Sequence, residues 1–111
     1  MKRSPMKRGK PLKPRSDKKI AYRASEAGMA GLAHMLAVKC LPCCVCGAAP
    51  PSEAHHCRSG GMARDDMKTI PLCVACHRGP HGYHAAKRTW EAENGPDHGF
   101  LPSVALGLGH D

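Results

Sequence analysis

A chain of 111 residues has room for one small domain, and most of its formal charge of +8 lies at one end. With one Trp, two Tyr and one Phe against ten Pro and twelve Gly, little apolar surface is available for a core, so we expect an additional staple such as a metal ion. The longest apolar run, residues 27–38, is shorter than the roughly 20 residues of a membrane span, which excludes a transmembrane protein.

The start of the chain alternates Lys and Arg with Pro, and residues 1–23 hold ten basic residues against one acid. Because like charges repel and Pro forbids regular structure, we expect residues 1–19 to form a disordered arm. Such an arm favours a polyanion such as DNA, since each phosphate contact releases counterions, although a solubilising or localisation tail is the alternative. The candidate DNA-binding residues are Lys2, Arg3, Lys7, Arg8, Lys10, Lys13, Arg15, Lys18 and Lys19.

Two helices are expected in the domain that follows, at residues 20–95. Residues 20–39 are rich in Ala, Leu and Met and predict a packing helix, with Ser25 as an N-cap candidate for its later part. Residues 85–94 predict a second helix, with Ala86 and Trp90 facing inward and Gly95 as its C-cap.

Short strands are expected at residues 53–58 and 67–72, the second with Pro71 at its edge or end. Residues 96–111 are rich in Gly and Pro and show little periodicity. We therefore expect residues 96–111 to be a flexible C-terminal tail.

Two C-x-x-C pairs are the strongest motif: Cys43 with Cys46, and Cys73 with Cys76. Each tight turn places two thiolates on one side of the backbone, and two such turns supply the four soft ligands of a structural zinc ion. Cys40 with Cys43 is a rival register, but the residue after Cys46 is a glycine, Gly47, which allows the left-handed turn of a knuckle. Roles for Cys40, Cys44 and Cys57 stay open.

The second pair continues into His77, which makes C-x-x-C-H, also the attachment motif of c-type haem. Haem attachment requires export, and the basic start is too long for a secretion signal, with no small-residue cleavage site at Lys39-Cys40. Seven cysteines also leave a disulfide framework with an odd thiol, which favours metal binding in a reducing compartment. We therefore expect a cytoplasmic protein that binds zinc.

Five histidines lie between and after the two pairs: His55, His56, His77, His81 and His84. Neighbours on a strand point to opposite faces, so we expect His55 and His56 to have different roles. The loop at residues 79–82 can fold back and bring His77 and His84 toward His55. Imidazoles that hold a divalent cation, beside a neutral histidine that accepts a proton from water, suit phosphodiester hydrolysis. Any single histidine could instead be a surface or zinc-bound residue.

The order of these motifs resembles that of the phage and prophage HNH-like (His-metal finger) nucleases related to the Ref recombination-enhancement nuclease. The resemblance covers residues 43–95 in its motifs and residues 1–19 in their basic character. Its motifs, besides the two C-x-x-C pairs, are Ala54-His55-His56, Asp65-Asp66, Thr69-Ile70-Pro71-Leu72, Gly82-Tyr83-His84, Trp90-Glu91 and Asn94-Gly95.

This resemblance implies a small α+β fold: a zinc-stabilised ββα-metal core with a preceding helix. It also implies a metal-dependent DNA endonuclease that acts in phage or prophage recombination in a bacterial cytoplasm, with a RecA filament as a further partner. By position, His55 would be a metal ligand, His56 the general base, and His77 and His84 candidates for the closing metal ligand, with His55 and His84 counted beside His56 among the catalytic residues. The catalytic metal would be Mg²⁺, Mn²⁺ or Zn²⁺, and an all-histidine site suits the last two at least as well as the first.

One departure from the HNH pattern concerns its middle position, since no Asn lies between the two C-x-x-C pairs. Asp65 or Asp66 could orient the base there or bind metal, with Asp66 as the candidate ligand, or the two could form a solvated turn. The alternative function is a non-catalytic zinc-finger protein that binds nucleic acid, which would not need His55, His56 or His84. The oligomeric state is not indicated by the sequence.

Overall fold

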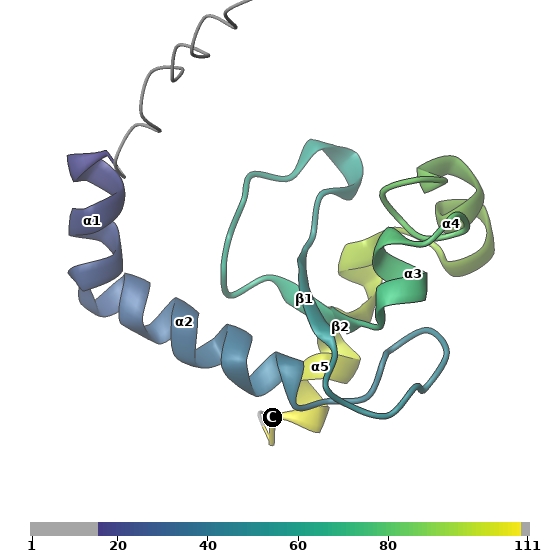
Figure 1. Cartoon of the computed structure of the whole chain (residues 1–111), viewed down its shortest axis with the longest axis horizontal. Coiled ribbons are helices and arrows are strands. Elements are labelled where there is room, and N and C mark those ends of the chain that lie inside the picture. The colour runs from purple at the N-terminus through teal and green to yellow at the C-terminus, as the bar shows by residue number, and fades with distance from the viewer. Residues whose placement is uncertain (1–15, 110–111) are drawn as a thin grey trace, which may run out of the picture.

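The centre of the structure is a two-stranded antiparallel sheet formed by β1 (Glu53–His56) and β2 (Thr69–Leu72) (Figure 1). This computed structural model describes residues 16–109. The register pairs His55 with Ile70 and His56 with Thr69. Every residue of β2 is buried, because helices contact the sheet from several sides. The result is a small α+β fold, as predicted, with strands at both predicted positions.

Helices surround this sheet in the described part of the chain, and none of them is long and apolar enough to cross a bilayer. The α-helices are α1 (Asp17–Ala24), α2 (Glu26–Lys39), α3 (Val74–Arg78), α4 (Lys87–Asn94) and α5 (Leu101–Gly107), and the 3-10 turns are η1 (Ser59–Gly61) and η2 (Asp97–Phe100). Figure 1 shows α1 and α2 on one side of the sheet and α3 and α4 on the other, with α5 below it.

The helix expected over residues 20–39 is in fact two helices that meet at Ser25. Ser25 is extended, with φ −74° and ψ 161°, and its hydroxyl accepts the N–H of Gly28 at 3.1 Å, so it is the N-cap of α2 that the sequence predicts. Ser16 caps α1 by accepting the N–H of Lys19 at 3.3 Å. The prediction of disorder is therefore wrong for Lys18 and Lys19, which lie in α1 because a capped helix start precedes them.

The remaining candidate DNA-binding residues lie outside the described residues. These are Lys2, Arg3, Lys7, Arg8, Lys10, Lys13 and Arg15.

A small core lies between α2, the sheet and α4. Trp90 is 2% exposed and packs edge-on against Tyr83 and Phe100, with ring centroids 5.1 and 5.9 Å apart. The inward position of Trp90 is as predicted, and α4 ends at Gly95, whose φ of 79° gives the predicted glycine C-cap. The core is formed by Val38, Cys43, Cys57, Ile70, Leu72, Tyr83, Trp90 and Val104.

The end of the chain is not the flexible tail that the sequence predicts. Residues 97–107 form η2 and α5, and these close the core, with Asp97 fully buried and Val104 4% exposed. The prediction failed because the Gly and Pro content outweighed a helical spacing of apolar residues, Leu101, Val104 and Leu108, which pack against the core. A second anchor is polar: the buried carboxylate of Asp97. Its partners, Arg58 and Ser59, lie 39 and 38 residues earlier in the chain.

Candidate functional site

Four cysteines gather beside the start of α3. The sulfur atoms of Cys43, Cys46, Cys73 and Cys76 all lie within 4.8 Å of one another, and those of Cys46 and Cys73 are 3.6 Å apart. A tetrahedral zinc ion with Zn–S bonds of about 2.3 Å separates its sulfurs by about 3.8 Å. The four cysteines thus fit a structural zinc ion, in the register that the sequence favours.

The backbone explains this arrangement. Gly47 adopts φ 75°, the left-handed turn expected of a knuckle, and its N–H donates to the carbonyl of Cys43 at 2.9 Å. The N–H of Cys44 donates to the carbonyl of Pro71 at 3.0 Å, which ties the first pair to β2. Since the second pair begins directly after β2, at Cys73, the two pairs meet at the end of this strand.

The other three cysteines lie outside this cluster. Cys40 is exposed at the end of α2. Cys44 and Cys57 contact the core, and burial raises the pKa of each thiol to about 12, so both stay protonated.

Within the cluster, one sulfur is the first to ionise. Burial alone would raise the pKa of Cys43, but hydrogen bonds from backbone N–H groups lower it to about 7. The pKa of Cys76 is raised by burial and by hydrogen bonds with neighbouring sulfurs. Binding of a zinc ion would favour the thiolate form of all four cysteines, as in structural zinc sites.

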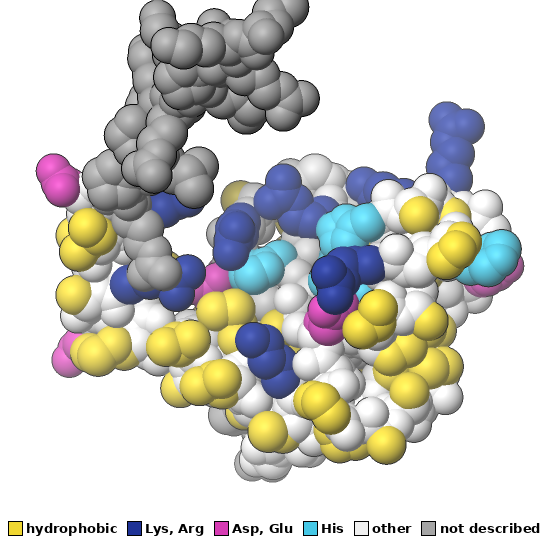
Figure 2. All heavy atoms as spheres, in the orientation of Figure 1, with side chains coloured by type: hydrophobic (Ala, Val, Ile, Leu, Met, Phe, Trp, Pro, Cys, Tyr) yellow, Lys and Arg dark blue, Asp and Glu magenta, His cyan; other side chains and the backbone are white. Residues whose placement is uncertain are grey.

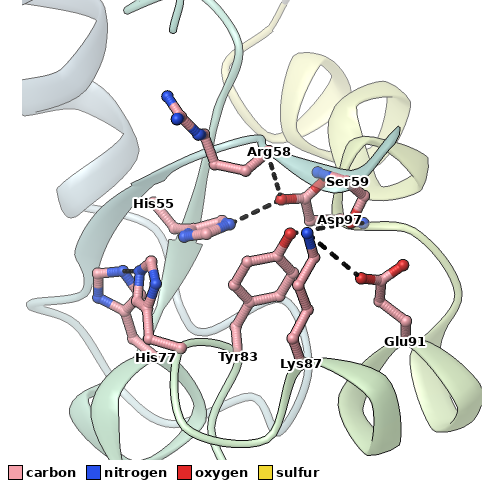
Figure 3. Close-up of polar contacts among 9 residues, drawn as sticks. His55, Arg58, Ser59, His77, Tyr83, Lys87, Glu91 and Asp97 are labelled. Carbon is pink, nitrogen blue, oxygen red and sulfur yellow. Dashed lines mark hydrogen bonds and ion pairs between the residues drawn. The ribbon is translucent and has the colours of Figure 1, made fainter. Parts of the chain in front are cut away.

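Three imidazoles form a second cluster, on the side of the sheet that faces α3. One ring nitrogen from each of His55, His77 and His84 lies within 4.8 Å of the other two, and the Nε2 atoms of His77 and His84 are 2.9 Å apart (Figure 3). His55 is 1% exposed at the base of the cluster, whereas His84 is exposed at its rim. Three imidazoles with one side open match the ligand set of catalytic zinc sites.

The loop after α3 folds back, as expected, and brings His84 to this cluster. The N–H of Tyr83 donates to the carbonyl of Cys76 at 2.9 Å, and that of His84 to the carbonyl of His77 at 3.2 Å. The Tyr83 ring then lies 4.4 Å from that of His55, between centroids. His81, at the tip of this loop, is exposed and outside the cluster.

A carboxylate lies behind two of the three imidazoles. Glu53 Oε1 is 2.9 Å from His77 Nδ1, and Asp97 Oδ2 is 2.8 Å from His55 Nε2. An ionised carboxylate only accepts hydrogen bonds, so each ring nitrogen must donate to it. The other nitrogen of each neutral ring then carries a lone pair, and in His55 this is Nδ1, which faces the neighbouring imidazoles (Figure 3). Such carboxylates orient metal-binding histidines and raise their basicity.

Asp97 is held in its ionised form by the backbone of η1. Its carboxylate accepts the N–H of Arg58 at 2.6 Å and that of Ser59 at 3.1 Å. Burial alone would raise the pKa of Asp97, but these bonds and the one from His55 lower it to about 2. Burial lowers the pKa of His55 to about 4, an effect larger than the opposing one of Asp97. His55 is therefore neutral at neutral pH, the state that binds metals.

His56 contacts a different residue from its neighbour His55, as strand alternation predicts. Its Nε2 lies 2.8 Å from Asp66 Oδ1, while Asp66 Oδ2 accepts the hydroxyl of Tyr22 at 3.0 Å. The hydrogen bond from His56 lowers the pKa of Asp66, so this carboxylate is ionised. A Cβ atom at Gly31 would lie 2.8 Å from that of Asp66, so glycine lets α2 pack closely against this residue.

Asp65 and Asp66, the two candidates for the middle position of the HNH pattern, make different contacts. Asp66 makes the contact expected of a residue that orients His56, and it does not belong to the three-histidine cluster. Asp65 accepts the N–H of Met67 at 2.9 Å and forms a turn.

The three-histidine cluster and His56 line one pocket of about 520 Å³. Figure 2 shows histidine side chains on this face with Lys and Arg side chains around them. Three cations line the pocket, and among the described residues no carboxylate does, because Glu53, Asp66 and Asp97 are turned toward the imidazoles. The pocket therefore favours an anionic ligand. Its lining is Ala54, His55, His56, Arg58, Arg64, His77, Tyr83, His84 and Lys87.

Sequence reasoning missed five charged residues of this site: Glu53, Arg58, Arg64, Lys87 and Asp97. A signal existed for Glu53, which lies two residues before His55 on β1 and therefore on the same face of the strand. No local pattern indicates Asp97 or the three cations.

Comparison with known proteins adds a family but no activity. Neither a search of curated proteins nor a search of solved structures finds a significant match. One family profile, described as a protein of unknown function (DUF968), matches residues 25–105, a span that contains both cysteine pairs, the three-histidine cluster and Asp97. The chain therefore belongs to the DUF968 family, whose function is unknown.

Proposed function

We propose that this protein is a metal-dependent endonuclease that hydrolyses phosphodiester bonds of DNA. One observation carries the proposal: the three-histidine cluster and His56, which Asp66 holds from behind, line the same pocket, and the charged side chains of that pocket are basic. A structural role alone would explain neither the open position at the cluster nor the cations around it.

His55, His77 and His84 would hold a divalent cation, with Glu53 and Asp97 fixing two of the rings. When bound, the cation would polarise the phosphate and stabilise the charge that develops on the leaving oxygen. Imidazole ligands suit Zn²⁺ or Mn²⁺ at least as well as Mg²⁺, which favours oxygen ligands.

His56 would act as the general base. Its side chain is 19% exposed and lines the pocket, so water can reach it. Asp66 holds the ring and would stabilise its positive charge once it takes a proton from the attacking water. Arg58, Arg64 and Lys87 would bind the phosphates on either side of the scissile bond.

The arrangement of the elements supports a ββα-metal core of HNH type. The β1–β2 pair is followed by α3, which contacts both strands, and His55 comes from the pair while His77 comes from the helix. Membership of the HNH nucleases, a part in phage recombination and the use of a RecA filament follow from the motif resemblance and belong to this proposal.

A plasmid-nicking assay on the full-length chain tests the activity, with Mg²⁺, Mn²⁺ or Zn²⁺ and with or without RecA filaments. We expect His56→Ala to lose about 10²- to 10⁴-fold in rate, the usual contribution of a general base. The matched control is His81→Ala, which removes an exposed histidine outside the site and should cut normally. DNA binding measured by mobility shift should persist in both variants. Binding without cleavage under every metal would instead favour a non-catalytic zinc-finger protein.

A further inference from the structure

Helix α2 is apolar on all sides except at His34, although much of it faces solvent. Between Glu26 and Lys39 it holds no Asp, Glu, Lys or Arg. Its buried residues are only Gly28, Gly31 and Val38. A helix that is apolar all round is normally covered on all sides, so α2 lacks a cover on the side opposite the core.

The uncovered side is one continuous stripe. Met29, Leu32 and Leu36 are 55%, 46% and 53% exposed, and Ala33 is exposed between them. This spacing of i, i+3, i+4 and i+7 places all four on one face of the helix. We call these four residues the α2 stripe. Figure 2 shows hydrophobic side chains gathered along the edge of the molecule that α1 and α2 form.

Helix α1 also lacks cover. None of its eight residues is buried, and Ile20 is 53% exposed. An isolated helix of this length is marginal in water, so α1 depends on its contacts with α2 and on the hydrogen bond from Tyr22 to Asp66.

We propose that the α2 stripe binds the α2 stripe of a second copy of this chain, with the two helices antiparallel. Helix α2 begins with an acid, Glu26, and ends with a base, Lys39, and both side chains are exposed. Neither forms an ion pair with another of residues 16–109. An antiparallel pair brings Glu26 of each copy to Lys39 of the other, whereas a parallel pair brings like charges together. Opposed helix dipoles add to the preference.

The same register makes the stripe complementary to itself. If Glu26 pairs with Lys39, then Met29 meets Leu36 and Leu32 meets Ala33, because the two numbers in each pair have the same sum. A twofold axis would then pass between Leu32 and Ala33, and the small Ala33 would make room for the larger side chain. Contacts that repeat in this way are those of a twofold-symmetric dimer.

The charges disfavour two other occupants. Helix α2 carries no Lys or Arg between Glu26 and Lys39, so the stripe itself offers DNA no phosphate contact. Lys19, Arg23 and Arg64 line a pocket that Leu32 borders, but Met29, Ala33 and Leu36 are not part of its lining. Residues 1–15 hold seven Lys or Arg, which makes them a poor apolar cover. A second copy supplies both the apolar stripe and the opposite charges at its ends.

Sedimentation equilibrium on the full chain, over a range of concentrations, tests the proposal. We expect a monomer–dimer equilibrium, and Leu36→Lys should weaken it by about 100-fold or more, because a buried apolar contact is replaced by a charge on both sides. The matched control is Leu106→Lys on α5, where the leucine is 73% exposed and lies outside the stripe, and it should dimerise like the wild type. Circular dichroism checks that both variants are folded. A wild-type chain that stays monomeric, or equal effects of both substitutions, would overturn the proposal.

Charge reversal tests the antiparallel register. Glu26→Lys or Lys39→Glu alone should weaken the dimer by about tenfold, since two attractive pairs become repulsive, and the double variant should recover the wild-type affinity. A double variant no tighter than either single variant would exclude the antiparallel pairing.

Discussion

The cysteine cluster and the histidine cluster are built from the same stretch of chain but differ in what surrounds them. The four cysteines form a complete set of four sulfur ligands. The three histidines are one ligand short of such a set, and they open into a pocket lined by Arg58, Arg64 and Lys87. Structural metal sites are closed and catalytic ones keep a position open, so the proposed function assigns stability to the cysteine cluster and catalysis to the histidine cluster.

The most severe test of this division is to remove one cysteine. Cys73→Ser should unfold the domain, because structural zinc contributes on the order of 10 kcal/mol to folding in small domains. Circular dichroism and elemental analysis for zinc measure the outcome. Cys40→Ser is the matched control, since Cys40 is exposed outside the cluster, and it should keep both fold and zinc. A Cys73→Ser protein with full zinc content and a normal melting curve would mean that other residues staple the fold.

The opposite result is expected from the histidine cluster. His84→Ala should strongly slow cleavage and remove one metal ion per chain while leaving the fold intact, because His84 is exposed and contributes to the rim rather than to the core. A loss of about 10³-fold in nicking rate is expected when the ligand set is incomplete. Metal analysis of the folded variant distinguishes a loss of metal at the histidine cluster from a loss at the cysteine cluster. Unchanged metal content with lost activity would show that His84 is not a metal ligand.

The two clusters also differ in how far they could be predicted. Each cysteine pair lies within a single turn of the chain. The C-x-x-C spacing and the glycine at position 47 are therefore enough to predict the geometry of the cluster. The histidine cluster needed the fold-back of residues 79–82, which the Gly and Pro in that loop indicate but do not prove. Nothing local indicates Asp97, because its partners His55, Arg58 and Ser59 lie 38 to 42 residues away in the chain.

The α1 error has a different cause. The run of Lys and Arg outweighed a helix start that was also present, a Ser–Asp pair at positions 16 and 17. Charge composition predicts disorder only on average, whereas one capped helix start acts on the residues beside it. The break at Ser25 was predictable as an N-cap, but the sequence alone does not show that a second helix precedes it.

Acid should destabilise the fold through His55. His55 has a pKa lowered to about 4 by burial, against about 6.5 in the unfolded chain, so the unfolded state binds more protons between these values. Stability should therefore fall by about 3 kcal/mol as the pH drops from about 6.5 to about 4. Asp97, with a pKa lowered to about 2, adds a further loss as the pH falls from about 4 toward 2.

Urea unfolding at a series of pH values measures this loss. The control is His81→Ala, which should show the same pH dependence as the wild type because His81 is exposed. A free energy of unfolding that does not change between pH 6.5 and pH 4 would contradict the buried, neutral state of His55.

The smallest expected effect concerns the cations around the open cluster, and it separates phosphate binding from catalysis. Arg64 is exposed at the pocket, so Arg64→Ala should leave stability unchanged. It should weaken DNA binding equally for all sequences and reduce the dependence of log affinity on log salt by about 1, the effect of one lost phosphate contact. Fluorescence anisotropy across a salt series measures the slope, with Arg88→Ala on α4, exposed and outside the pocket lining, as the control. If both variants changed the slope equally, DNA would be bound by general surface charge. The pocket would then not be the phosphate-binding site.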